Sequence, residues 1–283
     1  MAGQLPERPL LPRVSAEVER LEGECLLLRE ELARLHCERD DLLHTIGPNL
    51  EADYQLKIGT RQLELLTVQL EFRTLRRKIE LWQTALNRGL RPSEHEIEWT
   101  LQRELERWQQ GVADQAAAID RAQRRVDSFL DPADGRELRQ LYRRLALRLH
   151  PDVNPDHGPQ AKALWLQVAA AYHAADLPEL KALAILAEDI PALGPLDLPA
   201  DQLALKHQGL KQAVQHLLDE LAAIRAAPPH SLAPLLADER WVAERRQEMQ
   251  NEIDSLTARI AHLRVVLETL LRSGYDERQP DAN

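Results

Sequence analysis

The sequence contains few of the residue types that build disulfide-bonded, metal-binding or strand-rich folds. It has two cysteines, two phenylalanines and 11 glycines in 283 residues, and aromatic side chains make up 4% of it. Cys25 and Cys37 lack the spacing of metal ligands, so we expect buried free thiols and no oxidising compartment. Glycine-rich phosphate loops, H-E-x-x-H metal motifs and nucleophile elbows are absent. We therefore expect no enzyme active site, no cofactor and no metal site.

Long hydrophobic runs are absent as well. Residues 1–12 contain no apolar core of signal-peptide length, and we expect them to be a flexible N-terminus. No segment approaches the roughly 20 apolar residues of a membrane-spanning helix. These observations predict a cytoplasmic protein without a membrane partner. The formal net charge of −10 argues against a general nucleic-acid binder, which would normally be basic.

Apolar residues in heptad spacing dominate the first half of the chain. The sequence is 29% charged and rich in Leu, Glu, Arg and Ala, a composition typical of long helices. Heptad patterns run over residues 14–46, 58–86 and 101–129, so we expect coiled-coil helices across residues 13–130. Gly47-Pro48 is expected to end the first helix. The short link around Gly89 favours antiparallel pairing of the second and third helices, while the first either folds back or pairs with another copy of the chain.

The C-terminal part repeats this pattern. Residues 191–200 form a proline-rich linker that we expect to be stiff. Two further heptad helices lie in residues 201–273, with a turn at Pro228-Pro229-His230-Ser231 between them, which predicts a second antiparallel hairpin. Residues 274–283 are expected to be a disordered tail. The predicted fold class is all-α, with long antiparallel coiled-coil hairpins on both sides of a central segment, residues 131–190.

The central segment itself is predicted to be a helical hairpin. One apolar stripe at helical spacing lies before Pro151, and a second follows Pro159. Asp134 is the expected N-cap of the first helix, and Pro151 disfavours the α-conformation at His150, so this helix should end there. Pro159 suits the first turn of the second helix. The two stripes are Leu138, Leu141, Tyr142, Leu145 and Leu149, and Ala161, Leu164, Trp165, Val168, Ala171 and Tyr172.

Arginines lie mostly off the first stripe and should face water. A basic patch on an acidic protein indicates a specific acidic partner rather than bulk binding of polyanions. The run from Tyr142 to Pro155 reads Tyr-Arg-Arg-Leu-Ala-Leu-Arg-Leu-His-Pro-Asp-Val-Asn-Pro. With an apolar second helix after it, this run resembles the J domain, the module with which DnaJ-like co-chaperones engage DnaK-type (seventy-kilodalton heat-shock) chaperones.

The resemblance implies a partner-binding surface and a mechanism. The arginine face would dock on an acidic surface of the chaperone, and the His-Pro-Asp loop would trigger ATP hydrolysis there. Asp152 would pair with a partner arginine, His150 would supply a hydrogen-bonding ring, and Pro151 would set the turn. The implied surface residues are Arg139, Arg143, Arg144, Arg148, His150, Pro151, Asp152 and Asn154.

The chain also departs from the family pattern. The usual first-helix signature is missing, which leaves the tail of the preceding long helix as the candidate for that element. Val153 stands where Lys or Arg is common, Ala175 where Leu is usual, and residues 177–183 replace a basic stretch. A glycine/phenylalanine-rich linker and zinc-binding Cys-x-x-Cys repeats are absent, so the chain is similar to the specialised J proteins, whose J domain is joined to an unrelated targeting module.

Two functions follow from this reading. The first is a co-chaperone that recruits a DnaK-type chaperone and stimulates its ATPase, with the coiled coils used for targeting an unknown protein client or for homo-oligomerisation. The alternative is a structural coiled-coil scaffold in which the J-like hairpin is a spacer. Nucleic-acid binding by the arginine helix is the weakest reading, because the flanking helices are mixed in sign. Solvent exposure of the loop and of the arginine face distinguishes the first two.

Overall fold

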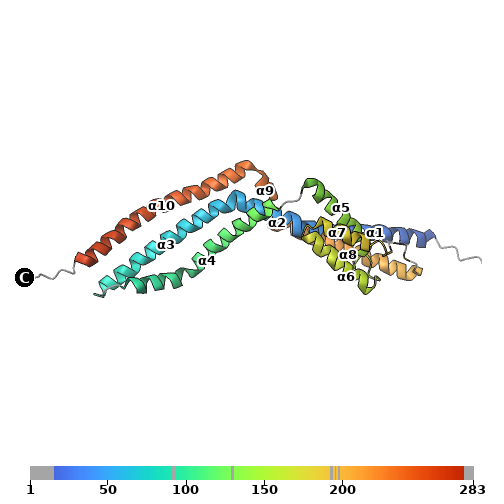
Figure 1. Ribbon diagram of the computed structural model, residues 1–283, viewed down its shortest axis with the longest axis horizontal. Coiled ribbons are helices and arrows are strands. Elements are labelled where there is room, and N and C mark those ends of the chain that lie inside the picture. The colour runs from blue at the N-terminus through green and yellow to red at the C-terminus, as the bar shows by residue number, and fades with distance from the viewer. Residues whose placement is uncertain are drawn as a thin grey trace, which may run out of the picture. The chain divides into compact units, whose positions relative to one another are not determined.

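The computed structural model describes residues 16–90, 93–128, 131–191, 194, 196 and 198–276, and throughout these ranges the regular structure is helical, without a strand. The chain forms two compact units (Figure 1). The first unit contains Met1–Pro48 and Leu130–His230, and the second contains Asn49–Phe129 and Ser231–Asn283. The predicted flexible N-terminus lies outside the described residues. The predicted tail does so from residue 277, while residues 274–276 are still helical.

The expected end of the first helix at Gly47-Pro48 is wrong. Helical turns continue from α1 (Ala16–Asp40) through a π-helix (Asp41–Ile46), α2 (Gly47–Tyr54) and a second π-helix (Gln55–Gly59) into α3 (Thr60–Asn87). The wide π turn explains this, since the Gly47 N–H donates to the carbonyl of Leu42, five residues back. A Cβ at residue 47 would lie 2.8 Å from that oxygen, so only glycine fits there. Pro48, the second residue of α2, follows directly on this π turn.

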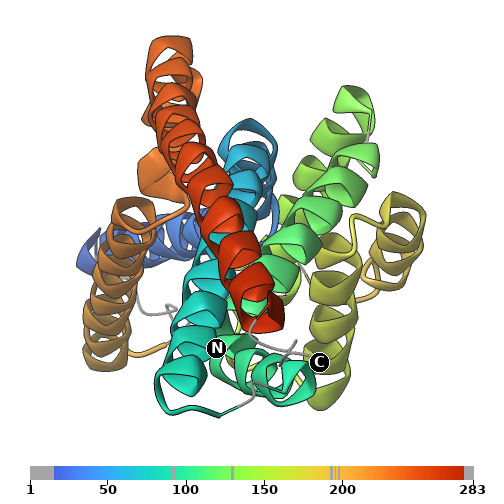
Figure 2. The same cartoon turned by 90° about the vertical axis from the view of Figure 1, so that its left-hand side faces the viewer.

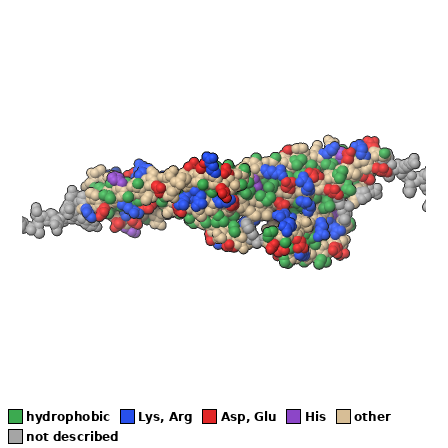
Figure 3. Space-filling model, turned by 90° about the horizontal axis from the view of Figure 1, so that it is seen from above, with side chains coloured by type: hydrophobic (Ala, Val, Ile, Leu, Met, Phe, Trp, Pro, Cys, Tyr) green, Lys and Arg blue, Asp and Glu red, His purple; other side chains and the backbone are tan. Residues whose placement is uncertain are grey.

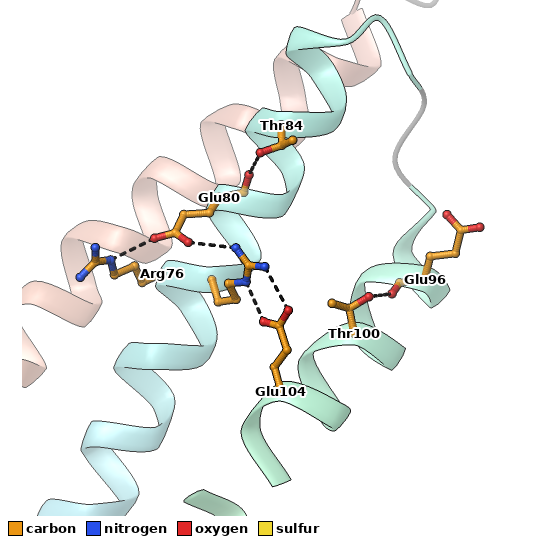
Figure 4. A network of polar contacts seen from close by, with 7 residues as sticks. Arg76, Glu80, Thr84, Glu96, Thr100 and Glu104 are labelled. Carbon is orange, nitrogen blue, oxygen red and sulfur yellow. Dashed lines mark hydrogen bonds and ion pairs between the residues drawn. The ribbon is translucent and has the colours of Figure 1, made fainter. Parts of the chain in front are cut away.

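The second unit contains the predicted antiparallel pair of α3 and α4 (Glu94–Asp127). Ser93 caps α4, where its side chain accepts from the Glu96 N–H, and Gly89 adopts a positive φ of 65° in the link. Figure 4 shows Glu104 of α4 directed toward α3. There it accepts from Arg77 Nε at 2.7 Å and from Nη2 at 3.0 Å. Beneath these surface pairs the core of this unit is formed by Trp82, Ile97, Leu101 and Leu105.

The predicted hairpin of residues 201–273 does not form. Its first helix, α8 (Ala200–Ala226), packs on α1 in the first unit, whereas α10 (Glu239–Asp276) packs on α3 in the second. Figure 2 views the second unit from the side where α3 and α10 end, with the two helices next to each other. A short 3-10 helix (His230–Leu232) and α9 (Ala233–Ala237) separate α8 from α10. Heptad spacing shows that a helix has a partner, but not which helix the partner is.

Both of these long pairs are parallel. In the second unit Gln69 of α3 donates to Glu252 of α10, and further along both helices Trp82 shares a core with Leu267 and Leu271. Glu24 of α1 lies 2.8 Å from His207 of α8, and further along Glu38 pairs with Arg225. The core between α1 and α8 contains Leu21, Cys25, Leu32, Leu35, Leu203, Leu210, Leu217 and Leu221. The first helix therefore finds its coiled-coil partner within the same chain. Both cysteines are buried free thiols as expected, and burial raises the pKa of Cys37 to about 12.

The central segment forms the predicted hairpin. Its helices are α5 (Pro132–Leu149) and α6 (Pro159–His173), with α7 (Leu177–Leu186) packed on both. Every residue of the two predicted stripes is buried or partly buried in their common core. Helix α5 begins earlier than expected, because the side chain of Asp131 rather than Asp134 caps it, accepting from the Ala133 N–H at 2.9 Å. Helix α5 also packs on α1 of the same unit.

Ala175 ends α6 in a conformation that disfavours alanine. Its φ is +56°, and the N–H of Asp176 donates to the carbonyl of Ala171 at 2.9 Å, as in a Schellman motif. Glycine adopts this conformation without strain. We expect Ala175→Gly to stabilise the first unit by about 0.5–1 kcal/mol, since the strain at an exposed site is removed. Thermal unfolding measures this; a lower melting temperature would contradict the assigned backbone conformation.

Among the helices described, none combines the length and the apolar character needed to cross a membrane.

Candidate interaction site at the His-Pro-Asp loop

The loop after α5 is a compact turn held by its own backbone. His150 has ψ 128°, the extended conformation that a following proline requires. The carbonyl of His150 accepts from the Val153 N–H at 3.1 Å and from the Asn154 N–H at 2.8 Å, and His150 Nδ1 accepts from the Asp152 N–H at 3.1 Å. These bonds fix the positions of the three motif residues relative to α5.

Helix α1 clamps the C-terminal half of this loop through Arg29. The guanidinium is only 7% exposed and makes three hydrogen bonds. Nε donates to the Val153 carbonyl at 2.8 Å, Nη2 to Asn154 Oδ1 at 2.9 Å, and Nη1 to the Gly194 carbonyl at 3.1 Å. Asn154 in turn donates to the Leu147 carbonyl at 2.9 Å. Asn154, predicted to bind a partner, is 4% exposed and its side chain is used inside the first unit.

Val153 is buried completely and belongs to the core between α1 and α8. A lysine or arginine at this position would place a charge in that core, which is unfavourable without a partner. The apolar residue at this position is thus explained by the packing of α1 and α8. Two kinds of contact therefore hold the loop on α1: the side chain of Val153 packs in the core, and Arg29 forms hydrogen bonds with Val153 and Asn154.

The three motif residues differ in accessibility. The His150 ring is 6% exposed, stacks on His36 of α1 with ring centroids 3.9 Å apart, and contacts the edge of Trp165. Pro151 is half-buried. The Asp152 side chain is 61% exposed, although its Oδ2 lies 3.0 Å from His36 Nε2. The loop is therefore partly exposed: the Asp152 carboxylate is accessible to solvent, and the His150 imidazole is buried.

Burial and neighbouring charges set the protonation of these groups. Burial lowers the pKa of His150, and the nearby His36 lowers it further. His36 also lowers the pKa of Asp152, against the opposing effect of partial burial. At neutral pH His150 is therefore uncharged and Asp152 is ionised. The accessible chemical group of the loop is an anionic carboxylate.

The arginine face is largely available. Arg139, Arg143 and Arg144 are exposed, but Arg148 is half-buried and donates to the Ala187 carbonyl at 3.0 Å. The first three line a groove of about 1230 Å³ between α1, α5 and α7, with an apolar floor. On the face of the molecule in Figure 3, Lys and Arg side chains are interspersed with Asp and Glu. The lining residues include Glu30, Ala33, Arg136, Glu137, Leu141, Leu147, Lys181, Ala184 and Ile185.

Helix α1 and the π-helix that follows it supply contacts that the sequence did not indicate. Besides Arg29 and His36, Asp40 at the end of α1 accepts from the buried Tyr142 hydroxyl at 2.5 Å, and Asp41 of the π-helix accepts from the Tyr172 hydroxyl. These acidic and basic residues look like ordinary surface positions of a coiled coil in the sequence. Their partners lie more than 100 residues away, so no local pattern could have indicated them.

Comparison of the chain with protein-family models gave no match. Comparison with the curated proteins also gave none, and no solved structure was found to be similar. The resemblance to the J domain therefore rests on the residues of the α5–loop–α6 hairpin.

Proposed function

We propose that this chain is a co-chaperone that recruits a DnaK-type chaperone and stimulates its ATPase. The observation that carries the proposal is the combination of an exposed arginine face on α5 with an ionised, exposed Asp152 in the loop that follows this helix. The chaperone would dock along Arg139, Arg143 and Arg144, and its own arginine would meet the Asp152 carboxylate. No chemistry on a small substrate is involved.

The long helices would serve targeting. The pairs α1–α8 and α3–α10 are each far longer than is needed to support a small hairpin. Exposed apolar side chains on them include Leu27, Leu205 and Val265. Such residues offer contacts to a protein client or to a second copy of the chain.

A structural scaffold is the second candidate, and burial within the loop favours it. His150, Val153 and Asn154 are at most 6% exposed and are covered through α1. In this case the hairpin is a packing element of the first unit, and Asp152 is merely its solvated tip. The two candidates differ in whether the arginine face binds anything.

Reversal of charge on the arginine face tests the proposal. Arg143→Glu together with Arg144→Glu should weaken binding of a DnaK-type chaperone by about tenfold or more at low salt, since attraction between complementary surfaces is replaced by repulsion. Binding that remains should depend less on salt. These two residues are used because Arg148 bonds to Ala187 and its replacement would disturb the fold.

The matched control is Arg245→Glu with Arg246→Glu on α10, which changes the net charge equally at exposed positions of the second unit. Surface plasmon resonance at several salt concentrations compares the two double variants. If both bind like the wild type, or if both lose affinity equally, the arginine face is not the docking surface.

A further inference from the structure

Three potential metal ligands from distant parts of the sequence meet at the loop. They are His36 on α1, His150 at the end of α5 and Asp152 in the loop. One ligand atom from each side chain lies within 4.8 Å of the other two. The two histidines are 114 positions apart in the chain (150 − 36), so their meeting depends entirely on the packing of α1 against the hairpin.

His36 is a buried polar side chain that contacts the Asp152 carboxylate. It is 5% exposed, and within the described part of the chain neither Nδ1 nor Nε2 makes an aligned hydrogen bond. Its Nε2 lies 3.0 Å from Asp152 Oδ2 without the alignment of a hydrogen bond. Burying an imidazole in this way is unfavourable unless another group satisfies its nitrogens. A metal ion between His36, His150 and Asp152 would do so.

The ligand types and the distance from His36 to Asp152 suit a divalent transition-metal ion, whereas the stacked rings of His36 and His150 have to tilt for both to coordinate it. Two imidazoles with one carboxylate are a common protein set for Zn²⁺ in sites that keep a fourth position open. Ligand atoms in a tetrahedral site with bonds near 2.0 Å are about 3.3 Å apart, close to the 3.0 Å between His36 Nε2 and Asp152 Oδ2. Because the Asp152 side chain is exposed, an ion can reach the site from solvent on that side.

The surroundings both help and oppose a cation. The Asp40 carboxylate acts on His150 as a nearby negative charge, and Arg39 acts as a nearby positive charge. Arg39 is itself paired with Asp40 at 3.3 Å and lies 3.9 Å from Glu220, which offsets its charge. His150 Nδ1 accepts from the Asp152 N–H, so coordination through that nitrogen replaces one hydrogen bond.

We propose that His36, His150 and Asp152 form a binding site for a divalent transition-metal ion, with Zn²⁺ the ion that best fits their ligand types, and that the bound ion fastens α1 to the loop. This departs from the expectation drawn from the sequence that no metal site exists. A second cluster, Asp40, His44 and His173, is less suited, because Asp40 already accepts from Tyr142 and pairs with Arg39.

Titration of the full-length protein with Zn²⁺, in competition with a chromophoric chelator, tests the site. The wild type should bind one equivalent, and His36→Leu should weaken this binding at least about 100-fold, because a direct ligand is lost. The variant should fold, since leucine suits a buried helical position and removes unsatisfied nitrogens. Asp152→Asn, at an exposed position, should weaken Zn²⁺ binding about tenfold or more. If His36→Leu misfolds, the Zn²⁺ affinity of this second variant tests the site.

Two controls separate this site from other histidines. His262→Leu replaces an exposed histidine on α10, and His173→Leu removes a ligand of the second cluster. Both should bind Zn²⁺ like the wild type. The proposal is overturned if the wild type binds no Zn²⁺, if His36→Leu and Asp152→Asn both bind it unchanged, or if the loss occurs in His173→Leu instead.

One consequence rests on the proposed function, whereas the metal site itself does not. A bound ion would occupy His150 and Asp152, the residues assigned to the chaperone, so Zn²⁺ should suppress ATPase stimulation by the wild type and not by His36→Leu. Stimulation that is absent without Zn²⁺ would refute the proposed function and leave the direct titration intact. Stimulation insensitive to Zn²⁺, in protein shown to bind the ion, would refute only this consequence.

Discussion

Replacing Arg29 with methionine is expected to destabilise the first unit by about 2–4 kcal/mol. The guanidinium satisfies the Val153 and Gly194 carbonyls and Asn154 Oδ1. Methionine retains most of the apolar stem but leaves these acceptors without a donor in the interior, at a cost of about 1–3 kcal/mol each. Part of this cost is offset, because the buried guanidinium, whose pKa burial lowers, no longer has to be desolvated.

Urea unfolding measures the loss, and hydrogen–deuterium exchange localises it to α1, the loop and α8. Arg34→Met is the matched control on the same helix. Its side chain is 45% exposed and pairs with Glu31 and Glu38 of the same helix, so its replacement should change the free energy of unfolding by less than about 0.5–1 kcal/mol. Equal effects of the two substitutions would show that Arg29 does not clamp the loop.

Asp152→Asn is expected to remove most of the stimulation of the chaperone ATPase while leaving the protein folded. The amide keeps the shape of the side chain but cannot form a charge-assisted pair with a partner arginine. The position is exposed, so the free energy of unfolding should change by no more than about 0.5 kcal/mol. The contact that the substitution weakens within the protein is the one between Asp152 and His36. A large effect on function thus accompanies a small effect on stability.

Single-turnover ATPase rates and melting temperature, measured on the same preparation without added Zn²⁺, check both parts. Asp156→Asn is the control, because it makes the same chemical change at another exposed position of the loop. Full stimulation by the Asp152→Asn variant would refute the co-chaperone mechanism. Unfolding of that variant would instead support the structural role of the loop.

Heptad spacing was sufficient to predict that the chain is helical and where most helices lie. The α3–α4 pair could be predicted as well, because a six-residue link from Arg88 to Ser93 leaves two long helices little choice of partner. The pairing of α8 with α1 could not. Leu203, Leu210, Leu217 and Leu221 form a seam that fits many helices equally, and a longer connection separates α8 from α10.

The hairpin of α5 and α6 was determined by its own sequence, since its two stripes are complementary and Pro151 and Pro159 set the ends of its helices. Which loop atoms face water was decided only by the tertiary structure. Arg29 and His36 reach the loop because α1 packs along α5, and Val153 enters a core built by α1 and α8. Contacts across more than 100 residues leave no periodic signal in the sequence, because each partner is an ordinary residue of its own helix until the helices meet.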